Sequence, residues 1–319
     1  MTRSLDDPIT RLVFCGTPRF AVPTLERLVE AGFQIGLVVT QPDKPRGRGL
    51  ELSPSPVKER ALQLGLAVTQ PEKIKNNEQL RSQLAGINPA AIVVVGYGRI
   101  IPRWMIDLPP LGNINLHASL LPKYRGAAPV QWAIACGESV TGVTTMRIDA
   151  GLDTGDILLQ REIPVAPDDT AVTIAPRMAT VGADLMVETL QKLRAGSITP
   201  RHQDESQASL APLLKKEDGR MDFSRPAVNI CNRLRGFQPW PGAFTSFRGK
   251  NLHVWAARPA TPRLAPATIA IEGDRLFVGA GESTAIELLE VQPEGKKRML
   301  ARDFIHGYHP QPGEKLGAD

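Results

Sequence analysis

The sequence has few of the residues that hold metals and disulfides. Its 319 residues include only three cysteines and five histidines. Cys15, Cys136 and Cys231 are scattered and never stand at C-x-x-C spacing, so we expect no disulfide framework and a reducing compartment. His306 and His309 form the one close histidine pair, in a Gly/Pro-rich tail segment. This supply of ligands predicts no metal site, structural or catalytic.

Long apolar runs are also lacking. Nowhere do 18 apolar residues follow one another, and the N-terminus, MTRSLDDPIT, carries acidic residues where a signal peptide would be apolar. The sequence also lacks G-x-G-x-x-G after its first apolar run, which argues against a dinucleotide site. The 42% hydrophobic and 22% charged fractions exclude a disordered or fibrous chain. We therefore expect a cytoplasmic protein of two domains with no membrane partner.

Positive charge is in small excess, and it is unevenly spread. The formal net charge is +5, and residues 211–319 hold 16 Lys and Arg against 12 Asp and Glu, a difference of +4. A basic last third fits a polyanionic partner. On charge alone, an ordinary solvated surface with a small surplus explains it equally well.

Apolar patterning predicts an α/β fold in the first two thirds of the chain. Short buried strands alternate with helical patterns, which is typical of a doubly wound, mostly parallel sheet covered on both faces. The predicted strands are 11–16, 35–40, 67–70, 90–95, 113–117, 142–148 and 155–165. The predicted helices are 21–31, 54–65, 77–84 and 171–195, the last with Asp169 or Thr170 as its cap and Pro176 inside it.

The pattern changes after the long helix. Residues 199–217 are polar and aperiodic, as in a linker, and 227–235 favours one more helix. Short strand-like runs with Gly/Pro turns follow, which predict a small β-barrel of the oligonucleotide-binding (OB) type. We therefore predict a catalytic domain over 1–198, a linker over 199–217 and an OB-like domain over 218–319.

Two polar segments carry the candidate chemistry. In GNINLHASLLPKYRGAAP, Asn115 and His117 stand two apart, which places both on one face of a strand. An amide there can donate to a developing oxyanion while an imidazole moves a proton, although spacing alone favours two side chains that satisfy backbone groups. The later segment 149–156 has three acids at a spacing unlike an EF-hand. A carboxylate there either hydrogen-bonds a histidine or stabilises a Gly-rich turn.

The segment NLHASLLPKYRGAAP closely resembles the signature of the 10-formyltetrahydrofolate-dependent formyltransferases. That family's catalytic set is an Asn and a His within N-x-H and an Asp within a later L-D-x-G. The resemblance places these roles on Asn115, His117 and Asp153. It implies that Asn115 donates to the oxyanion, that His117 moves the amine proton, directly or through a water, and that Asp153 orients His117.

Further segments resemble the methionyl-tRNA branch of that family: FCGTPRFAVPTLERL, VTQPDKPRGRG, GYGRIIP, GLDTGDIL and GFQPWPGAF. The resemblance implies formyl transfer from 10-formyltetrahydrofolate to the α-amino group of initiator methionyl-tRNA, by a monomer that needs no metal. The folate-binding positions it implies are Gly98, Arg99, Ile100, Ile101, Ser119, Leu120, Leu121, Pro122, Asp149 and Gly151. For Ile100 and Ile101, plain core packing is an equal alternative.

The same resemblance implies two places of contact with tRNA. The segment 41–49, which composition predicts to be an exposed loop, carries Lys44, Arg46 and Arg48, and the resemblance directs them to the acceptor end. In the C-terminal domain, Lys296, Lys297 and Arg298 would hold the backbone of the acceptor arm.

Three other functions remain open on the sequence. One is a folate-dependent formyltransferase that acts on an amino sugar of a nucleotide, against which stand the basic 41–49 segment and the L-D-T-G-D form of the acidic one. Another is a hydrolase that releases formate from 10-formyltetrahydrofolate, for which the basic C-terminal domain would have no purpose. The third is an RNA-binding protein without activity, against which the intact Asn115, His117 and Asp153 argue.

Overall fold

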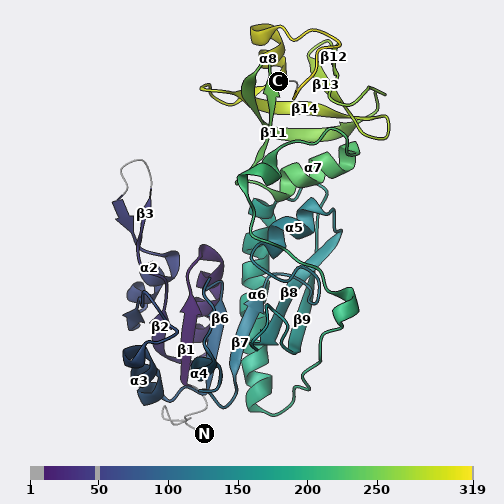
Figure 1. Ribbon diagram of the computed structural model, residues 1–319. Helices are drawn as coiled ribbons and strands as arrows, with labels where there is room; N and C mark the ends of the chain where they lie inside the picture. The colour runs from purple at the N-terminus through teal and green to yellow at the C-terminus, as the bar shows by residue number, and fades with distance from the viewer. Residues whose placement is uncertain (1–10, 47–50, 318–319) are drawn as a thin grey trace. The chain divides into compact units, whose positions relative to one another are not determined.

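A seven-stranded sheet forms the centre of the first part of the chain (Figure 1). The structure is a computed structural model and describes residues 11–46 and 51–317. Sheet order is β5-β2-β1-β6-β7-β8-β9. The first five strands in this order, from β5 through β2, β1 and β6 to β7, pair in parallel. Strand β8 pairs antiparallel with β7, and β9 pairs antiparallel with β8. Their bounds are β1 Arg11–Gly16, β2 Gln34–Val39, β5 Val68–Thr69, β6 Ala91–Val95, β7 Asn113–His117, β8 Val140–Arg147 and β9 Ile157–Pro164. The predicted mostly parallel sheet is confirmed.

Apolar strands explain this sheet. Every residue of β6, AIVVV, is buried, as are the five residues of β1 after Arg11. Strands buried on both faces are typical of a parallel sheet between helices. The helices are α1 Val22–Glu30, α2 Pro56–Gln63, α3 Glu78–Ile87, α4 Arg103–Ile106, α5 Pro129–Ala135 and α6 Ala171–Arg194, with a 3-10 turn at Arg19–Ala21. Helices α4 and α5 were not expected from the sequence.

Local polar signals set the helix ends. The Ser55 hydroxyl accepts from the Lys58 amide at 3.1 Å and begins α2, and Asn77 accepts from the Leu80 amide at 2.9 Å and begins α3. For α6, the Thr170 hydroxyl accepts from the Thr173 amide at 3.2 Å, so Thr170 caps the long helix. That helix contains Pro176, as the sequence predicts.

The expectation of a loop over 41–49 is wrong in part. Lys44–Arg46 forms a strand, β3, which pairs antiparallel with β4, Glu51–Ser53, in a small hairpin. Three cations and two prolines suggest a loop by composition, but pairing with a later segment decides the structure. The remaining predicted cation, Arg48, lies outside the described residues.

The chain divides into two compact units, and each is described by itself. One comprises the residues up to Pro129, Val140–Pro164 and Ala175–Pro212. The other comprises Val130–Ser139, Val165–Ile174 and the chain from Leu213 onward. The predicted domain limits remain a proposal, and the second unit also takes two short segments from the first two thirds of the sequence. In the described ranges no helix is long and apolar enough to span a membrane.

The second unit is built on an antiparallel, barrel-like sheet with the order β10-β11-β14-β13-β12, and β15 pairs with β14. Helices α7 and α8 pack on it, around a core that includes Leu252, Ile286 and Phe304. Bounds are α7 Ala227–Gly236, β10 Ala243–Phe247, β11 Lys250–Ala260, β12 Ile269–Glu272, β13 Arg275–Ala280, β14 Thr284–Pro293, β15 Met299–Leu300 and α8 Ala301–Tyr308. Helix α8 corrects the reading of the His306 region as a mere tail.

One ion cluster, formed by a buried glutamate and two exposed arginines, stabilises that sheet. Glu287 of β14 is only 5% exposed, and its carboxylate accepts from Arg275 at 2.8 and 3.1 Å and from Arg258 at 2.9 Å. The two guanidinium groups, Arg275 foremost, lower the pKa of Glu287 to about 2. Such a carboxylate is charged in the fold at all ordinary pH values.

Candidate active site

Strand β7 carries the predicted Asn–His pair. Alternation along the strand places Asn113, Asn115 and His117 on one face. The Asn113 amide donates to the backbone of α4, to Met105 O at 2.9 Å and Ile106 O at 3.0 Å, so this residue is structural. Asn115 is half-buried, and its side chain makes no hydrogen bond within the described ranges of the chain. Its amide is therefore available to a ligand.

His117 is buried between two oxygen atoms. Its side chain is 5% exposed. The Nε2 atom lies 2.9 Å from Tyr124 O, and because a carbonyl only accepts, Nε2 carries the proton of the neutral ring. The Nδ1 atom lies 3.6 Å from Asp153 Oδ2. The neutral ring therefore keeps its lone pair on Nδ1, and a proton that arrives there meets a carboxylate.

The loop after β7 brings Tyr124 O to that position. Tyr124 has a left-handed backbone, with φ +62°. The loop is fixed to β8 through the buried Thr144 hydroxyl, which donates to Ser119 O at 2.6 Å and accepts from the Leu121 amide at 3.2 Å. The Ser119 hydroxyl donates to Lys123 O at 2.6 Å. These contacts hold the histidine's backbone partner in place without help from a ligand.

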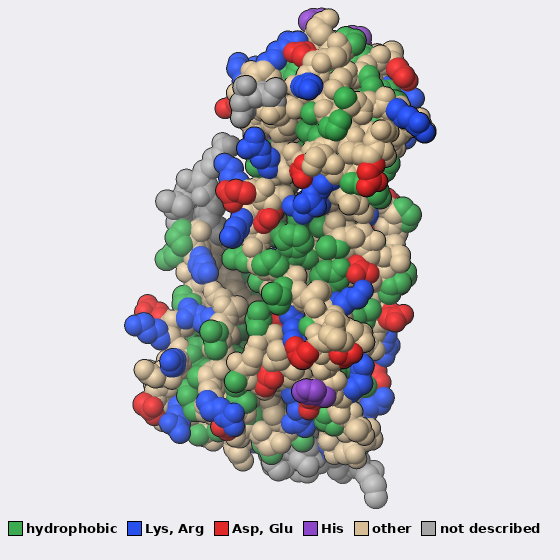
Figure 2. All heavy atoms as spheres, turned by 45° about the vertical axis from the view of Figure 1, so that its right-hand side comes forward, with side chains coloured by type: hydrophobic (Ala, Val, Ile, Leu, Met, Phe, Trp, Pro, Cys, Tyr) green, Lys and Arg blue, Asp and Glu red, His purple; other side chains and the backbone are tan. Residues whose placement is uncertain are grey.

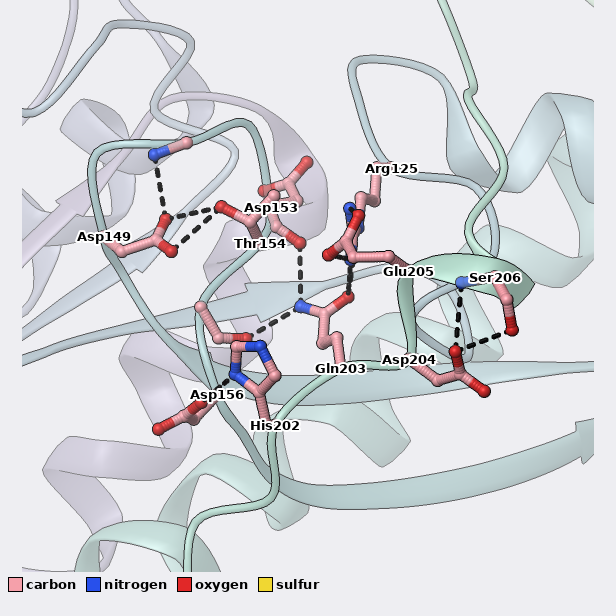
Figure 3. Close-up of polar contacts among 12 residues, drawn as sticks. Arg125, Asp149, Asp153, Thr154, Asp156, His202, Gln203, Asp204, Glu205 and Ser206 are labelled. Atoms are coloured by element: carbon pink, nitrogen blue, oxygen red, sulfur yellow. Dashed lines mark hydrogen bonds and ion pairs between the residues drawn. The ribbon is translucent and has the colours of Figure 1, made fainter.

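Of the three acids in 149–156, only Asp153 reaches His117. Its Oδ2 atom also accepts from the Gly126 amide at 2.9 Å. Asp149 instead accepts from the Gly151 amide at 3.0 Å and from the Thr154 hydroxyl at 2.8 Å, which stabilises the turn (Figure 3). Asp156 faces His202, 3.2 Å away (Figure 3). Asp149 therefore stabilises the Gly-rich turn, as one reading expects, whereas Asp153 lies within ion-pair distance of His117 Nδ1 but beyond a hydrogen bond.

The predicted folate-binding positions differ in exposure. Ile100 is 92% exposed, whereas Ile101 is 8% exposed and packs in the core with Val94 and Tyr97, so core packing holds for Ile101. Arg99 is tied to the backbone, since its guanidinium donates to Glu72 O. The others fall into three groups by exposure: Gly151 and Asp149 are exposed, Leu120 and Pro122 are half-buried, and Ser119 and Leu121 are buried. Gly98 adopts φ +73°, which favours glycine.

The base of the β3–β4 hairpin is charge-paired. Asp43 accepts from Lys58 Nζ at 2.6 Å and from Gln70 Nε2 at 2.6 Å, and these bonds, Lys58 first, lower the pKa of Asp43. The Asp43 carboxylate is thus occupied by Lys58. Lys44, the first residue of β3, is exposed, so its charge faces solvent.

The predicted cations of the second unit lie between β14 and β15, and all three are exposed. The Arg298 guanidinium stacks 3.7 Å from the centre of the Trp255 ring and lies 3.6 Å from Glu290, so it is already engaged. Lys296 and Lys297 are the more available pair. Figure 2 shows Lys and Arg side chains interspersed with Asp and Glu over one face of the molecule, so any anion attraction there is local.

Comparison with known proteins decides the family. The profile described as "Formyl transferase" matches residues 10–190, and that described as "Formyl transferase, C-terminal domain" matches residues 213–309. The chain belongs to the formyl transferase family. A curated relative from Koribacter versatilis, named methionyl-tRNA formyltransferase, is 66% identical and aligns over 96% of this chain and 98% of its own length. Another curated relative of the same name, from Bacillus subtilis, is 43% identical and aligns over 98% of this chain and 99% of its own length.

A solved structure of similar fold is WlaRD, a sugar 3N-formyl transferase. It has a TM-score of 0.66 and 19% identity, and the match covers 91% of this chain and 99% of that one. This likeness shows the fold alone. Formyltransferases of this family use 10-formyltetrahydrofolate as the formyl donor. In the ranges 11–46 and 51–317, no three His, Cys, Asp or Glu residues cluster as metal ligands.

Sequence reasoning missed two groups of this candidate site, Tyr124 O and Gly126 N, which contact His117 and Asp153. Both are backbone atoms, so no side-chain type in the sequence indicates them. For Gly126, however, the glycine itself is a sequence signal, and the structure shows why it is needed. Its φ is +123°, and a Cβ there would lie 2.8 Å from Ala211 O, so only glycine fits after the arginine of K-Y-R-G.

Proposed function

We propose that this formyltransferase moves the formyl group of 10-formyltetrahydrofolate to the α-amino group of initiator methionyl-tRNA, as a cytoplasmic monomer. The observation that carries the proposal is the convergence of Asn115, His117 and Asp153 in one site. The name shared by relatives up to 66% identical supports the acceptor.

The site's chemistry fits acyl transfer to an amine. The neutral α-amino nitrogen attacks the formyl carbon, and the carbonyl oxygen becomes an oxyanion. The Asn115 amide donates to that oxyanion. The amine proton passes to His117 Nδ1, directly or through a water, and the resulting imidazolium is stabilised by Asp153 and by Tyr124 O. Collapse of the intermediate breaks the bond to the folate nitrogen, which leaves with the proton that His117 returns.

Two further parts of the chain complete this proposal. The folate lies against residues 98–101 and 119–122 and the turn that Asp149 and Gly151 form. The acceptor end meets the segment 41–49, whose sequence includes Lys44, Arg46 and Arg48, and Lys296, Lys297 and Arg298 hold the tRNA backbone. The exposure of Ile100, Lys44 and Lys296 supports these roles.

The test is formyl transfer to methionyl initiator tRNA, with Asn115→Ala beside the wild type. We expect wild-type product and a kcat about 10²–10³-fold lower in the variant, because one oxyanion donor is lost. Asn76→Ala is the matched control, since Asn76 is exposed. It should retain full activity.

Other outcomes refute parts of the proposal. Formate released without product would indicate a hydrolase. Transfer to an amino-sugar nucleotide, with none to tRNA, would remove the tRNA roles of Lys44 and Lys296. Product from Asn115→Ala at the wild-type rate would remove Asn115 as the oxyanion donor.

A further inference from the structure

Residues 201–211, in the polar segment after α6, are held by main-chain hydrogen bonds along the loop after β7 that carries Tyr124 and Gly126, here called the active-site loop. The Arg201 amide and carbonyl exchange bonds with Ile157 at 2.9 and 2.8 Å. Farther on, the Arg125 amide donates to Ser209 O at 2.8 Å, and the Ala211 amide donates to Arg125 O at 2.7 Å. Residues 201–211 therefore run beside the loop that carries Tyr124 and Gly126, within the same compact unit.

Gln203 is the buried side chain of this segment. It is 3% exposed, in a stretch whose neighbours on either side are exposed. Its Nε2 donates to Asp153 O at 2.8 Å and to Gly155 O at 2.7 Å, and its Oε1 accepts from Arg125 Nε at 3.0 Å and Nη2 at 2.9 Å. Figure 3 shows the carboxamide between Asp153 and Arg125. All four hydrogen-bonding positions of the amide are thus used.

Arg125 is fixed from its other side. Two hydrogen bonds, at 2.8 and 2.9 Å, join its guanidinium to the Glu205 carboxylate (Figure 3). The next residue, Gly126, donates its amide to Asp153 Oδ2. The carbonyl and the carboxylate of Asp153 are therefore both held by one connected group, in which Gln203 is the central link.

Asp153 needs such support, because its backbone is left-handed with φ +53°, a conformation that an aspartate adopts at some cost. Its carboxylate must also stay 3.6 Å from His117 Nδ1. We infer that Gln203 is a positioning residue for formyl transfer: its amide holds the Asp153 turn so that the carboxylate faces His117. This inference rests on the proposed function of Asp153 and His117.

Two substitutions separate the parts of this role. Gln203→Glu keeps an acceptor for Arg125 but removes both N–H donors to the Asp153 turn. Gln203→Met keeps the length of the side chain and removes every polar contact. If Gln203 positions Asp153, both variants lose kcat by about 10–100-fold, because a small misplacement of a catalytic group is costly. The KM values for folate and tRNA change by less than about threefold, because the substrate contacts remain.

The control is Gln63→Glu. Gln63 is exposed and also accepts from an arginine, Arg60 Nη1 at 3.0 Å, so it makes the same change away from the site. It should behave as wild type. Nitrogen NMR shifts of the His117 ring, recorded in the folded variants, give a second readout that needs no acceptor substrate. We expect these shifts to differ from the wild-type values in both Gln203 variants and to equal them in Gln63→Glu.

Two results would overturn the inference. One is wild-type kcat with unchanged His117 shifts in Gln203→Glu and Gln203→Met. The other is a fall in kcat that only follows the fraction of unfolded protein, which indicates a purely structural role. Failure of the proposed function is distinguishable, since wild type itself would then make no formylmethionyl-tRNA while the His117 shifts still report on Gln203.

Discussion

Replacing Gly126 by alanine tests the close approach between the active-site loop and residues 209–211. The new Cβ would lie 2.8 Å from Ala211 O and 3.3 Å from Ala211 C, and both are backbone atoms that cannot rotate away. The φ of +123° is also one that alanine avoids. Either the loop or the neighbouring segment must therefore move.

The cost follows from the interactions at stake. A non-glycine residue in a disfavoured backbone region costs about 1–3 kcal/mol. Separation of the two segments also weakens the bonds from Ala211 N to Arg125 O, 2.7 Å, and from Ala128 N to Ala211 O, 3.1 Å. At about 1 kcal/mol for each bond, the free energy of unfolding should fall by about 3–5 kcal/mol in all. The Gly126 amide also moves from Asp153 Oδ2, so kcat should fall as well.

Urea denaturation and steady-state formyl transfer measure the two effects. Gly86→Ala is the matched control, because Gly86 lies inside α3 and a Cβ on it would have no neighbouring atom within 4 Å. It should raise the free energy of unfolding by up to about 1 kcal/mol. If the free energy of unfolding of Gly126→Ala lies within about 1 kcal/mol of the wild-type value and its kcat equals that of wild type, the close approach does not constrain the site.

Two further predictions concern the second unit. Because its folded-state pKa, about 2, lies below the usual 4.5, Glu287 stabilises the fold above pH 4.5 and loses that effect as pH falls toward 2. Glu287→Gln should therefore cost up to about 3 kcal/mol at pH 7, and urea denaturation should show its gap to wild type narrowing by about 1.4 kcal/mol per pH unit below 4.5; a gap independent of pH would contradict the pairing. Replacing Lys296 and Lys297 by alanine should weaken tRNA binding and lower the slope of log K against log salt by about 0.7–0.9 for each phosphate that is no longer neutralised, as measured by filter binding; an unchanged slope would remove these lysines from the interface.

Much of the fold was predictable because its signals are local. The short run AIVVV of β6 favours a buried strand because four of its five residues are β-branched, and α6 shows apolar spacing from Ala171 to Arg194. The β3–β4 hairpin was not predictable, since K-P-R looks like a loop until its partner E-L-S is known. Helix α8 was missed because His306 and Gly307, both poor helix formers, weaken its pattern.

The candidate site was predictable only in part, for a related reason. Asn115 and His117 share a strand face, so their spacing is informative. Asp153 could be singled out from Asp149 and Asp156 by resemblance alone, since all three look alike in the sequence. Gln203 had no signal, because its burial depends on pairing between residues far apart in the chain.

The run beside the active-site loop has a consequence for the order in which the protein is made. A nascent chain that has emerged as far as Arg194 contains all three proposed catalytic side chains and all seven strands of the first sheet. It still lacks Ser209 and Ala211, the main-chain partners of Arg125. The loop that carries Tyr124 can therefore pair with its main-chain partners only after the chain beyond α6 has been made. A fragment that ends at Arg194 would carry the proposed catalytic residues without the segment that hydrogen-bonds to this loop.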